Sequence, residues 1–125
     1  MRFTAIGLVC VGVFLSTLGT ANAEATVNQI LNIYDSAAPG SSERLLWETA
    51  MASTVVGFGW ANTELVENKH EPPLYCEPPK NDFTSHQIMG MLRRAAKEDK
   101  RIGDQPYGLG ILLMLQRTFP CNKSN

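Results

Sequence analysis

The sequence predicts an all-α fold, a compact bundle of about four helices with one proline-rich loop and one disulfide. Apolar residues recur at helical spacing in four segments of the chain. No alternation of apolar and polar residues longer than a few positions, the pattern typical of a half-buried strand, occurs anywhere. Residues 67–82, between the second and third helical segments, hold four prolines and no apolar period. Each proline restricts its own backbone and that of its predecessor, which predicts a stiff loop.

The first helical segment begins at a capping box. Thr26 and Gln29 have the spacing at which each side chain bonds the other residue's backbone N–H. Apolar residues follow at helical spacing, namely Ile30, Leu31, Ile33 and Tyr34. We therefore expect a short helix over 26–36, which ends at Ala38-Pro39-Gly40.

The second segment predicts a long helix over 42–66. Ser41-Ser42 offers the N-cap, and Glu43 lies in the first turn, where the helix dipole favours an acid. The apolar residues of this helix are Leu45, Leu46, Met51, Val55, Phe58 and Leu65. Gly57 and Gly59 each lower helix propensity by about 1 kcal/mol. They would be tolerated where another helix packs close to the backbone.

The third and fourth segments predict two shorter helices. A second capping box, Thr84 with Gln87, starts the third helix, and Gly103 is its natural stop. Phe83 and Ile88 occupy the two staple positions around this box, and the remaining apolar face is Met91, Leu92, Ala95 and Ala96. Asp104 can cap a last helix over 105–118, with Tyr107, Ile111, Leu112, Leu115 and Thr118 inward.

Residues 1–23 have the three parts of a secretory signal peptide. Arg2 supplies the positive charge, residues 5–18 form the apolar stretch, and Ala21-Asn22-Ala23 matches the small-x-small cleavage pattern. The apolar stretch is short for a membrane span. A retained membrane anchor and a lipid anchor on Cys10 are the alternatives. We expect an exported, periplasmic protein that begins at Glu24 and has no membrane contact after cleavage.

Cleavage would leave 102 residues, which is enough for one domain, 24–125, with a modest core. Twelve acidic and ten basic residues give this domain a net charge of −2. That balance gives no reason to expect a nucleic acid or an anionic membrane as partner. Residues 24–77 carry a net charge of −6 and residues 78–125 a net charge of +4. We expect the two halves to neutralise each other in the fold.

Two cysteines, Cys76 and Cys121, remain once Cys10 leaves with the signal. Two thiols in an oxidising compartment predict one disulfide. In the chain-entropy description, closing a loop of 46 residues stabilises the fold by about 4 kcal/mol. Because small domains are stable by only about 5–15 kcal/mol, this disulfide has a structural role.

The sequence offers little chemistry. Cys76 could act as a nucleophile with His86 or His70 as its base, but the expected disulfide removes the thiol. His70, Glu71 and His86 lack the spacing of a helical zinc pair and a third ligand nearby. Two helical acids, Glu43 and Glu48, are five residues apart and do not share a face. We therefore expect a binding protein that is not an enzyme and holds no cofactor or metal.

The second half of the chain resembles the type VI secretion amidase immunity family. The residues that carry the resemblance are Tyr75-Cys76-Glu77-Pro78-Pro79, the Thr84–Gln87 cap with its helix, and the terminal Phe119-Pro120-Cys121. They span 75–121, close to half of the domain. Glu77 departs from the family pattern, in which an apolar residue is more usual at this position. The closest resemblance is to immunity proteins of the fourth amidase effector family.

This resemblance implies a periplasmic protein of a Gram-negative bacterium. Such proteins bind a cognate peptidoglycan amidase, a cysteine peptidase type effector, and protect the producer from cell-wall hydrolysis. They also tend to act as homodimers. Two alternatives stay open: an envelope binding or stress protein of the same helical fold without a toxin partner, and a small periplasmic enzyme.

Two segments are the candidate inhibitory surface. The first is the polar loop stretch that begins after the second helix, with Glu67, Asn68, Lys69, His70, Glu71 and Tyr75. The second is the basic face expected on the third helix, with Arg93, Lys97 and Arg101. The second helix also carries Trp47, Phe58 and Trp60, which are either ordinary core aromatics or more apolar surface than a small core can bury. The second alternative adds to the expectation of a homodimer.

Overall fold

The computed structural model describes residues 24–78, 80 and 83–121. Its helices are α1 (Val27–Ser36), α2 (Ser42–Thr63), α3 (Ser85–Glu98), α4 (Lys100–Gly103) and α5 (Tyr107–Thr118). A π-helical turn, η1 (Glu64–Asn68), extends α2. No strand occurs among the described residues, and Cys76 is bonded to Cys121, so the all-α class and the disulfide are confirmed. The predicted signal peptide lies outside the described residues.

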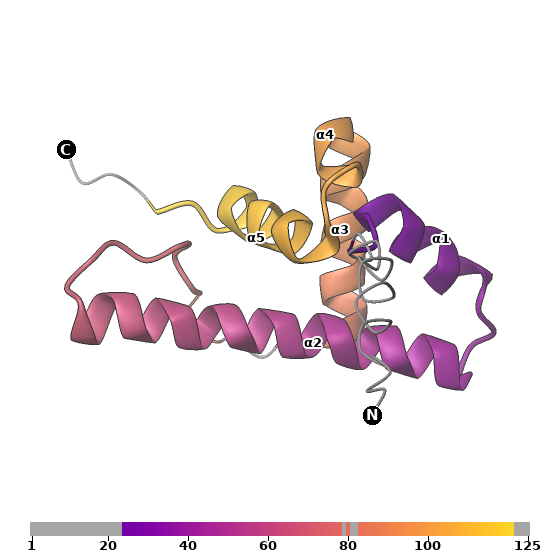
Figure 1. The fold of residues 1–125 in the computed structure, drawn as a ribbon, viewed down its shortest axis with the longest axis horizontal. Helices are drawn as coiled ribbons and strands as arrows, with labels where there is room; N and C mark the ends of the chain where they lie inside the picture. The colour runs from indigo at the N-terminus through magenta and orange to yellow at the C-terminus, as the bar shows by residue number, and fades with distance from the viewer. Residues whose placement is uncertain (1–23, 79, 81–82, 122–125) are drawn as a thin grey trace, which may run out of the picture.

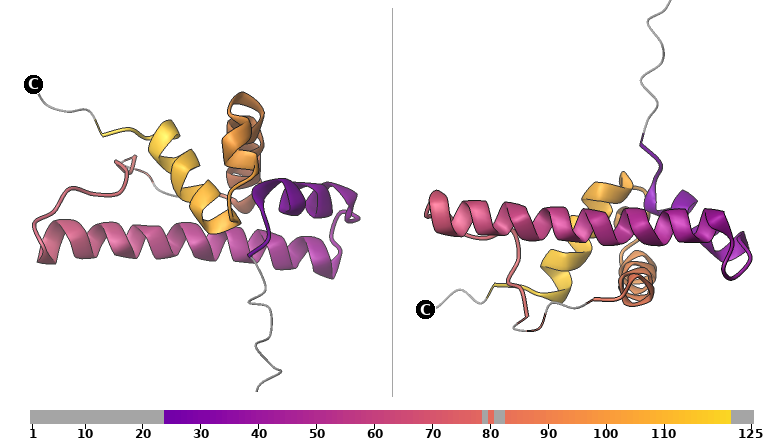
Figure 2. Two further views of the ribbon diagram at one scale, coloured as in Figure 1. Left: turned by 45° about the horizontal axis from the view of Figure 1, so that its top comes forward. Right: turned by 90° about the horizontal axis from the view of Figure 1, so that it is seen from below.

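The long helix α2 forms one edge of the molecule (Figure 1). The other helices all lie on the same side of it (Figure 1). The first helix, α1, lies near the N-terminal end of α2, whereas α3 crosses its middle steeply (Figures 1 and 2). Residues 69–78, which follow η1, form a loop that folds back over the C-terminal end of α2 (Figure 1). This loop therefore lies at the end of the molecule that is remote from α1.

The core lies where α1, α2, α3 and α5 meet. Its fully buried residues are apolar and come from all four helices and from the loop, among them Val27, Ile30, Met51, Leu92, Met114 and Tyr75. At about 25 cal/mol per Å² of apolar surface, each such side chain stabilises the fold by roughly 1.5–3 kcal/mol. Phe83, just before α3, stacks on Phe119, just after α5, with ring centroids 5.2 Å apart.

Three of the four predicted helix starts are confirmed. Thr26 and Gln29 form a reciprocal capping box at α1, and Thr84 with Gln87 does the same at α3. The Ser41 hydroxyl accepts a hydrogen bond from the Arg44 backbone N–H at the start of α2. These caps satisfy backbone donors that the first helical turn leaves unpaired, which is why short polar side chains mark the boundaries.

The start of α5 was predicted wrongly. Asp104 does not cap it, because the Asp104 carboxylate accepts from the Asn28 side-chain amide and Pro106 is the N-cap residue. Glu24, from the other end of the domain, supplies the acceptor: its carboxylate lies 3.0 Å from the Gly108 backbone nitrogen. Thr118, expected inward on α5, is exposed, and Met114 is buried in its place.

The third helix ends earlier than expected. Asp99 has an extended backbone, with φ −133° and ψ 102°, and separates α3 from the short α4 that ends at the predicted stop, Gly103. Its carboxylate accepts a hydrogen bond from the Arg101 N–H and so caps α4. An acid that can cap a new turn therefore competes with continuation of the helix at this position.

The two glycines of α2 do not mark a helix–helix contact. Gly57 is exposed, and a methyl group added there would meet nothing within 4 Å. At Gly59 the neighbour is the Glu77 carboxylate from the loop, at 3.3 Å from the added carbon. The expectation of a closely packed helix is wrong at both positions, and at Gly59 a loop side chain approaches instead.

Candidate functional site

The loop that follows α2 begins with a defined backbone turn. In η1 the Lys69 N–H bonds the Glu64 carbonyl, and the Glu71 N–H bonds the Leu65 carbonyl at 2.9 Å. Between them, His70 has a φ of +54°, in the left-handed region that non-glycine residues rarely adopt. This helix end is one residue wider than a Schellman motif because its last turn is π-helical, and histidine holds the left-handed position that is usually glycine. The first limb of the loop is therefore fixed to α2.

The second limb is held to α2 by a buried side chain, Asn62. Its Oδ1 accepts from the Leu74 backbone N–H at 2.7 Å, and its Nδ2 donates to the Tyr75 carbonyl at 2.9 Å. Asn62 is only 6% exposed, and it is the one polar residue buried in the described part of the chain. A side-chain amide thus supplies both hydrogen bonds that two consecutive loop residues need in a place without water.

Further contacts brace the same limb against α5 and the chain end. The Gln116 side-chain amide donates to the Leu74 carbonyl at 3.1 Å, and the Cys76 N–H bonds the Phe119 carbonyl at 3.0 Å. The disulfide then joins Cys76 to Cys121. The limb is therefore attached to α2 on one side and to the end of α5 on the other.

Tyr75 anchors this limb in the core. It is 1% exposed, and its hydroxyl donates to the Glu77 carboxylate at 3.0 Å. Burial, together with this hydrogen bond and the negative charge of Glu77, raises the pKa of the Tyr75 phenol above its ordinary value. Tyr75 was predicted to contact a partner, and its burial is a correction: a side chain packed in the core does not reach a partner surface.

The tip of the loop is polar and exposed. Lys69, His70, Glu71 and Pro72 are all exposed, whereas Pro73 is half-buried. Glu67 and Asn68, predicted in the loop, are exposed residues of η1, so the loop begins two residues later than expected. A hollow of about 300 Å³ lies beside the tip and is lined by Asn62, Thr63, Val66, Glu67, Pro73, Tyr75, Cys76 and Glu77.

Two of the three predicted basic residues, Arg93 and Lys97, share a face of the third helix, and the other does not lie on this helix. Arg93 forms an ion pair with Asp35 of α1, Lys97 is exposed on α3, and Arg101 lies on α4. Figure 1 places α3 and α4 away from the loop at the end of α2. The structure therefore separates the two surfaces that were expected to act together.

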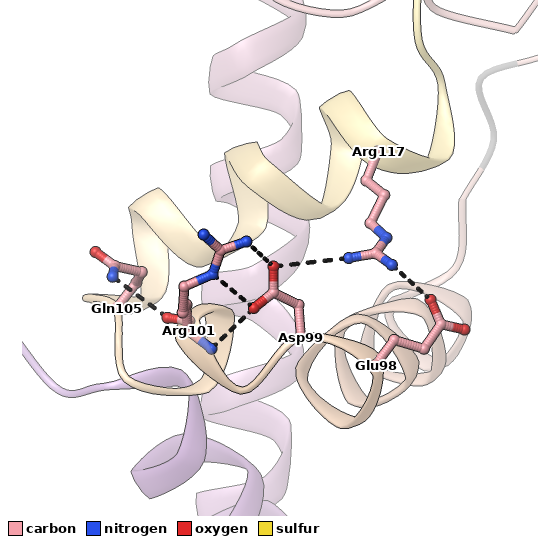
Figure 3. Close-up of polar contacts among 5 residues, drawn as sticks. All are labelled: Glu98, Asp99, Arg101, Gln105 and Arg117. Carbon is pink, nitrogen blue, oxygen red and sulfur yellow. Dashed lines mark hydrogen bonds and ion pairs between the residues drawn. The ribbon is translucent and has the colours of Figure 1, made fainter.

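Arg101 belongs to a network around Asp99 (Figure 3). Its guanidinium binds both carboxylate oxygens of Asp99, at 3.0 and 2.8 Å, and Arg117 links Asp99 to Glu98. The hydrogen bonds from Arg101 lower the pKa of the Asp99 carboxyl from 3.8 to about 2. A hollow of about 610 Å³ between α4 and α5 has this network on its rim. Two acids and two bases of this network pair with one another. The network therefore favours neither an anionic nor a cationic ligand.

The three aromatic residues predicted for an interface separate into two groups. Trp47 is half-buried and packs edge-on against Tyr107, and Phe58 is half-buried against the core. Trp60 is 72% exposed on the outer face of α2. It belongs to a stripe of exposed residues with alternating spacings of three and four, which we name the α2 seam: Leu46, Thr49, Ser53, Val56 and Trp60. Between Glu48 and Glu64, α2 contains no charged residue.

The residues that were considered for catalysis or metal binding have other roles or lie exposed in the structure. Cys76 is oxidised, His70 is part of the helix end, and His86 is exposed on α3. Glu48 accepts a hydrogen bond from the Tyr34 hydroxyl at 2.7 Å, as a structural acceptor. Within the described ranges, no three His, Cys, Asp or Glu side chains group as metal ligands do, and no helix has the length and apolarity to cross a membrane.

Sequence analysis missed the two amides that hold the loop, Asn62 and Gln116. One signal for Asn62 was present: it follows Val55 by seven residues, so an amide falls on the inward face of an apolar helix. Gln116 carries no such signal, because it is an exposed polar residue on α5.

The chain matches no protein-family model, no curated protein and no solved structure.

Proposed function

We propose that this protein is a periplasmic immunity protein that binds and inhibits a peptidoglycan amidase delivered by a type VI secretion system. The observation that carries the proposal is the braced loop, whose exposed tip is polar while both of its limbs are fixed. The sequence resemblance over residues 75–121 supports the same function, since that segment includes Tyr75, Cys76 and Cys121, which hold the second limb of the loop.

A fixed loop suits an inhibitor. Binding a cleft with a flexible segment loses conformational entropy, about 0.5–1.5 kcal/mol for each immobilised long side chain and more for the backbone. Here the helix end at His70, two prolines and the Asn62 bonds have already ordered the backbone. Glu71 at the tip would also suit a pocket that contains a catalytic histidine and cysteine.

We also propose that the protein acts as a homodimer through the α2 seam. The pattern is self-complementary: an antiparallel pairing centred on Ser53 sets Leu46 of one copy against Trp60 of the other. Ser53, the smallest residue of the seam, lies at the centre, where two helices approach most closely. Leu46 and Trp60 are 64% and 72% exposed in the monomer, and pairing would remove that apolar surface from water.

The partner can be tested without assuming its identity. Tagged protein isolated from the periplasm should carry an enzyme that cleaves peptidoglycan peptides, identified by mass spectrometry. Recovery of envelope proteins without amidase activity would favour the alternative, a binding protein without a toxin partner. Light scattering of the free protein at micromolar concentration should give twice the monomer mass, and Trp60→Glu should give the monomer.

A further inference from the structure

We propose that Asn62 is a positioning residue that sets the conformation of the inhibitory tip without touching the partner. The proposal rests on the function above, in which the tip of the loop is the contact surface. Asn62 itself lies under the loop and is 94% shielded from solvent, since only 6% of its surface is exposed. Asn62 lines the hollow beside the tip, but so little of it is exposed that its route to the binding surface is the loop backbone to which it bonds.

The two limbs of the loop leave from different elements. The first limb is bonded to the end of α2 through Glu64 and Leu65. The second limb is bonded to the α5 end by Gln116, Phe119 and the disulfide. Asn62 bonds the backbone of the second limb to α2, so it connects the two limbs through one rigid helix. The separation of the two ends of the tip, and hence its shape, depends on this connection.

The side-chain amide of Asn62 is suited to this role, whereas the side chains of aspartate and alanine are not. Its oxygen faces a backbone donor at Leu74 and its nitrogen faces a backbone acceptor at Tyr75. An aspartate would keep the acceptor but set a carboxylate against the Tyr75 carbonyl, 2.9 Å away. Nδ2 is also 3.5 Å from the Glu77 carboxylate, so a negative charge at Asn62 would add repulsion. An alanine would leave a buried donor and acceptor without partners.

Two substitutions and one control separate positioning from general destabilisation. Asn62→Ala removes both hydrogen bonds to the second limb, whereas Asn62→Asp removes only the one to the Tyr75 carbonyl. The control is Val55→Ala, two helical turns earlier on the same face of α2, where Val55 is 8% exposed and no hydrogen bond to the loop is lost. The first readout is hydrogen exchange at the Leu74 amide in the free protein, compared with Leu92 and Met114 in the core. The second is the association and dissociation rates with the amidase.

We expect exchange at Leu74 to rise roughly 10- to 100-fold in Asn62→Ala, in line with the loss of a buried hydrogen bond, and to rise less in Asn62→Asp, which keeps an acceptor for the Leu74 N–H. Core amides should change no more than they do in Val55→Ala. Amidase binding should weaken at least about 10-fold in the Asn62 variants and remain near the parent value in the control. In Asn62→Asp the weakening comes from repulsion between the new carboxylate and the Tyr75 carbonyl and Glu77 carboxylate.

Two results overturn the positioning role. One is Leu74 exchange that does not change, or that changes equally in Val55→Ala. The other is a loop that becomes mobile while amidase affinity stays at the parent value. If the parent protein binds no amidase, the proposed function fails, and the exchange measurements still decide whether Asn62 orders the loop.

Discussion

Replacing Gly110 with alanine tests the packing of the whole bundle. Gly110 lies on the face of α5 that contacts α1, and its position is buried. A Cβ atom there would lie 2.2 Å from Cγ2 of Val27, a separation that real Cβ atoms do not show. Val27 is fully buried and its branched side chain has few allowed rotamers, so α1 and α5 would have to separate.

The expected change in the free energy of unfolding of Gly110→Ala follows from two opposing effects. Alanine gains about 1 kcal/mol of helix propensity over glycine, whereas overpacking a close-packed core costs about 1–3 kcal/mol. The clash is severe, so the upper part of that range applies and Gly110→Ala should lower the free energy of unfolding by about 1–2 kcal/mol. Gly90→Ala in α3 is the matched control, because nothing lies within 4 Å of an added methyl group there. It should raise stability by up to about 1 kcal/mol.

Urea denaturation measures the free energy of unfolding of both variants, which should fall in Gly110→Ala and rise in Gly90→Ala. Val27→Ala removes the clashing methyl group, so combining it with Gly110→Ala should cost less than the sum of the two single changes. The account of the α1–α5 contact is refuted if Gly110→Ala stabilises the protein as much as Gly90→Ala does. Strictly additive effects in the double variant would contradict it as well.

Three further predictions concern the loop and the helix boundaries. Cys121→Ala should lower the free energy of unfolding by about 2–5 kcal/mol, and alkylation of the unreduced parent protein should label neither Cys76 nor Cys121. His70→Gly should raise stability by about 0.5 kcal/mol in urea denaturation, because relief of the left-handed backbone, about 1–2 kcal/mol, exceeds the entropy cost of glycine. The Asp99 carboxyl should titrate near pH 2 by NMR, below its unfolded value of about 3.9. Because the pKa of Asp99 is lower in the folded state, its ionised carboxylate stabilises the fold at pH values above the unfolded pKa. This contribution is lost as the pH falls through about 2. Asp99→Asn should remove that part of the dependence of stability on pH.

The helices could be predicted because their signals are local. A capping box is read within four residues, and it located the starts of α1 and α3. The disulfide was predicted from the two cysteines, Cys76 and Cys121, that remain once the expected signal peptide is removed. The stiffness of the loop followed from its prolines, although its first residue was misplaced, since the turn η1 continues α2 to Asn68.

The missed features depend on residues that are distant in the sequence. Glu24 caps α5 from 84 positions away, so Asp104 was the better local candidate. Asn62 and Gln116 reach the loop from 12 and 42 residues away. Tyr75 was expected on the surface because it lies in the loop that was predicted to contact the partner. Its burial depends on how the loop folds back onto α2, which no local pattern encodes.

The central claim is that the polar tip of the loop inhibits the amidase. A triple substitution at the tip tests it: Lys69→Ser, His70→Gly and Glu71→Ser. These changes leave the η1 turn and every backbone hydrogen bond of the helix end in place. Glu43→Ser with Arg94→Ser is the control, because it also removes one exposed acid and one exposed base.

The measurement is inhibition of peptidoglycan cleavage by the co-purified amidase, with each variant in turn. The account predicts that the tip variant keeps its helices and disulfide but inhibits with a dissociation constant at least about 100-fold weaker, as expected for a hot spot worth about 3 kcal/mol. The control should inhibit as the parent does. A tip variant that inhibits as strongly as the parent would contradict the account, because the loop would then be a connector that carries Cys76.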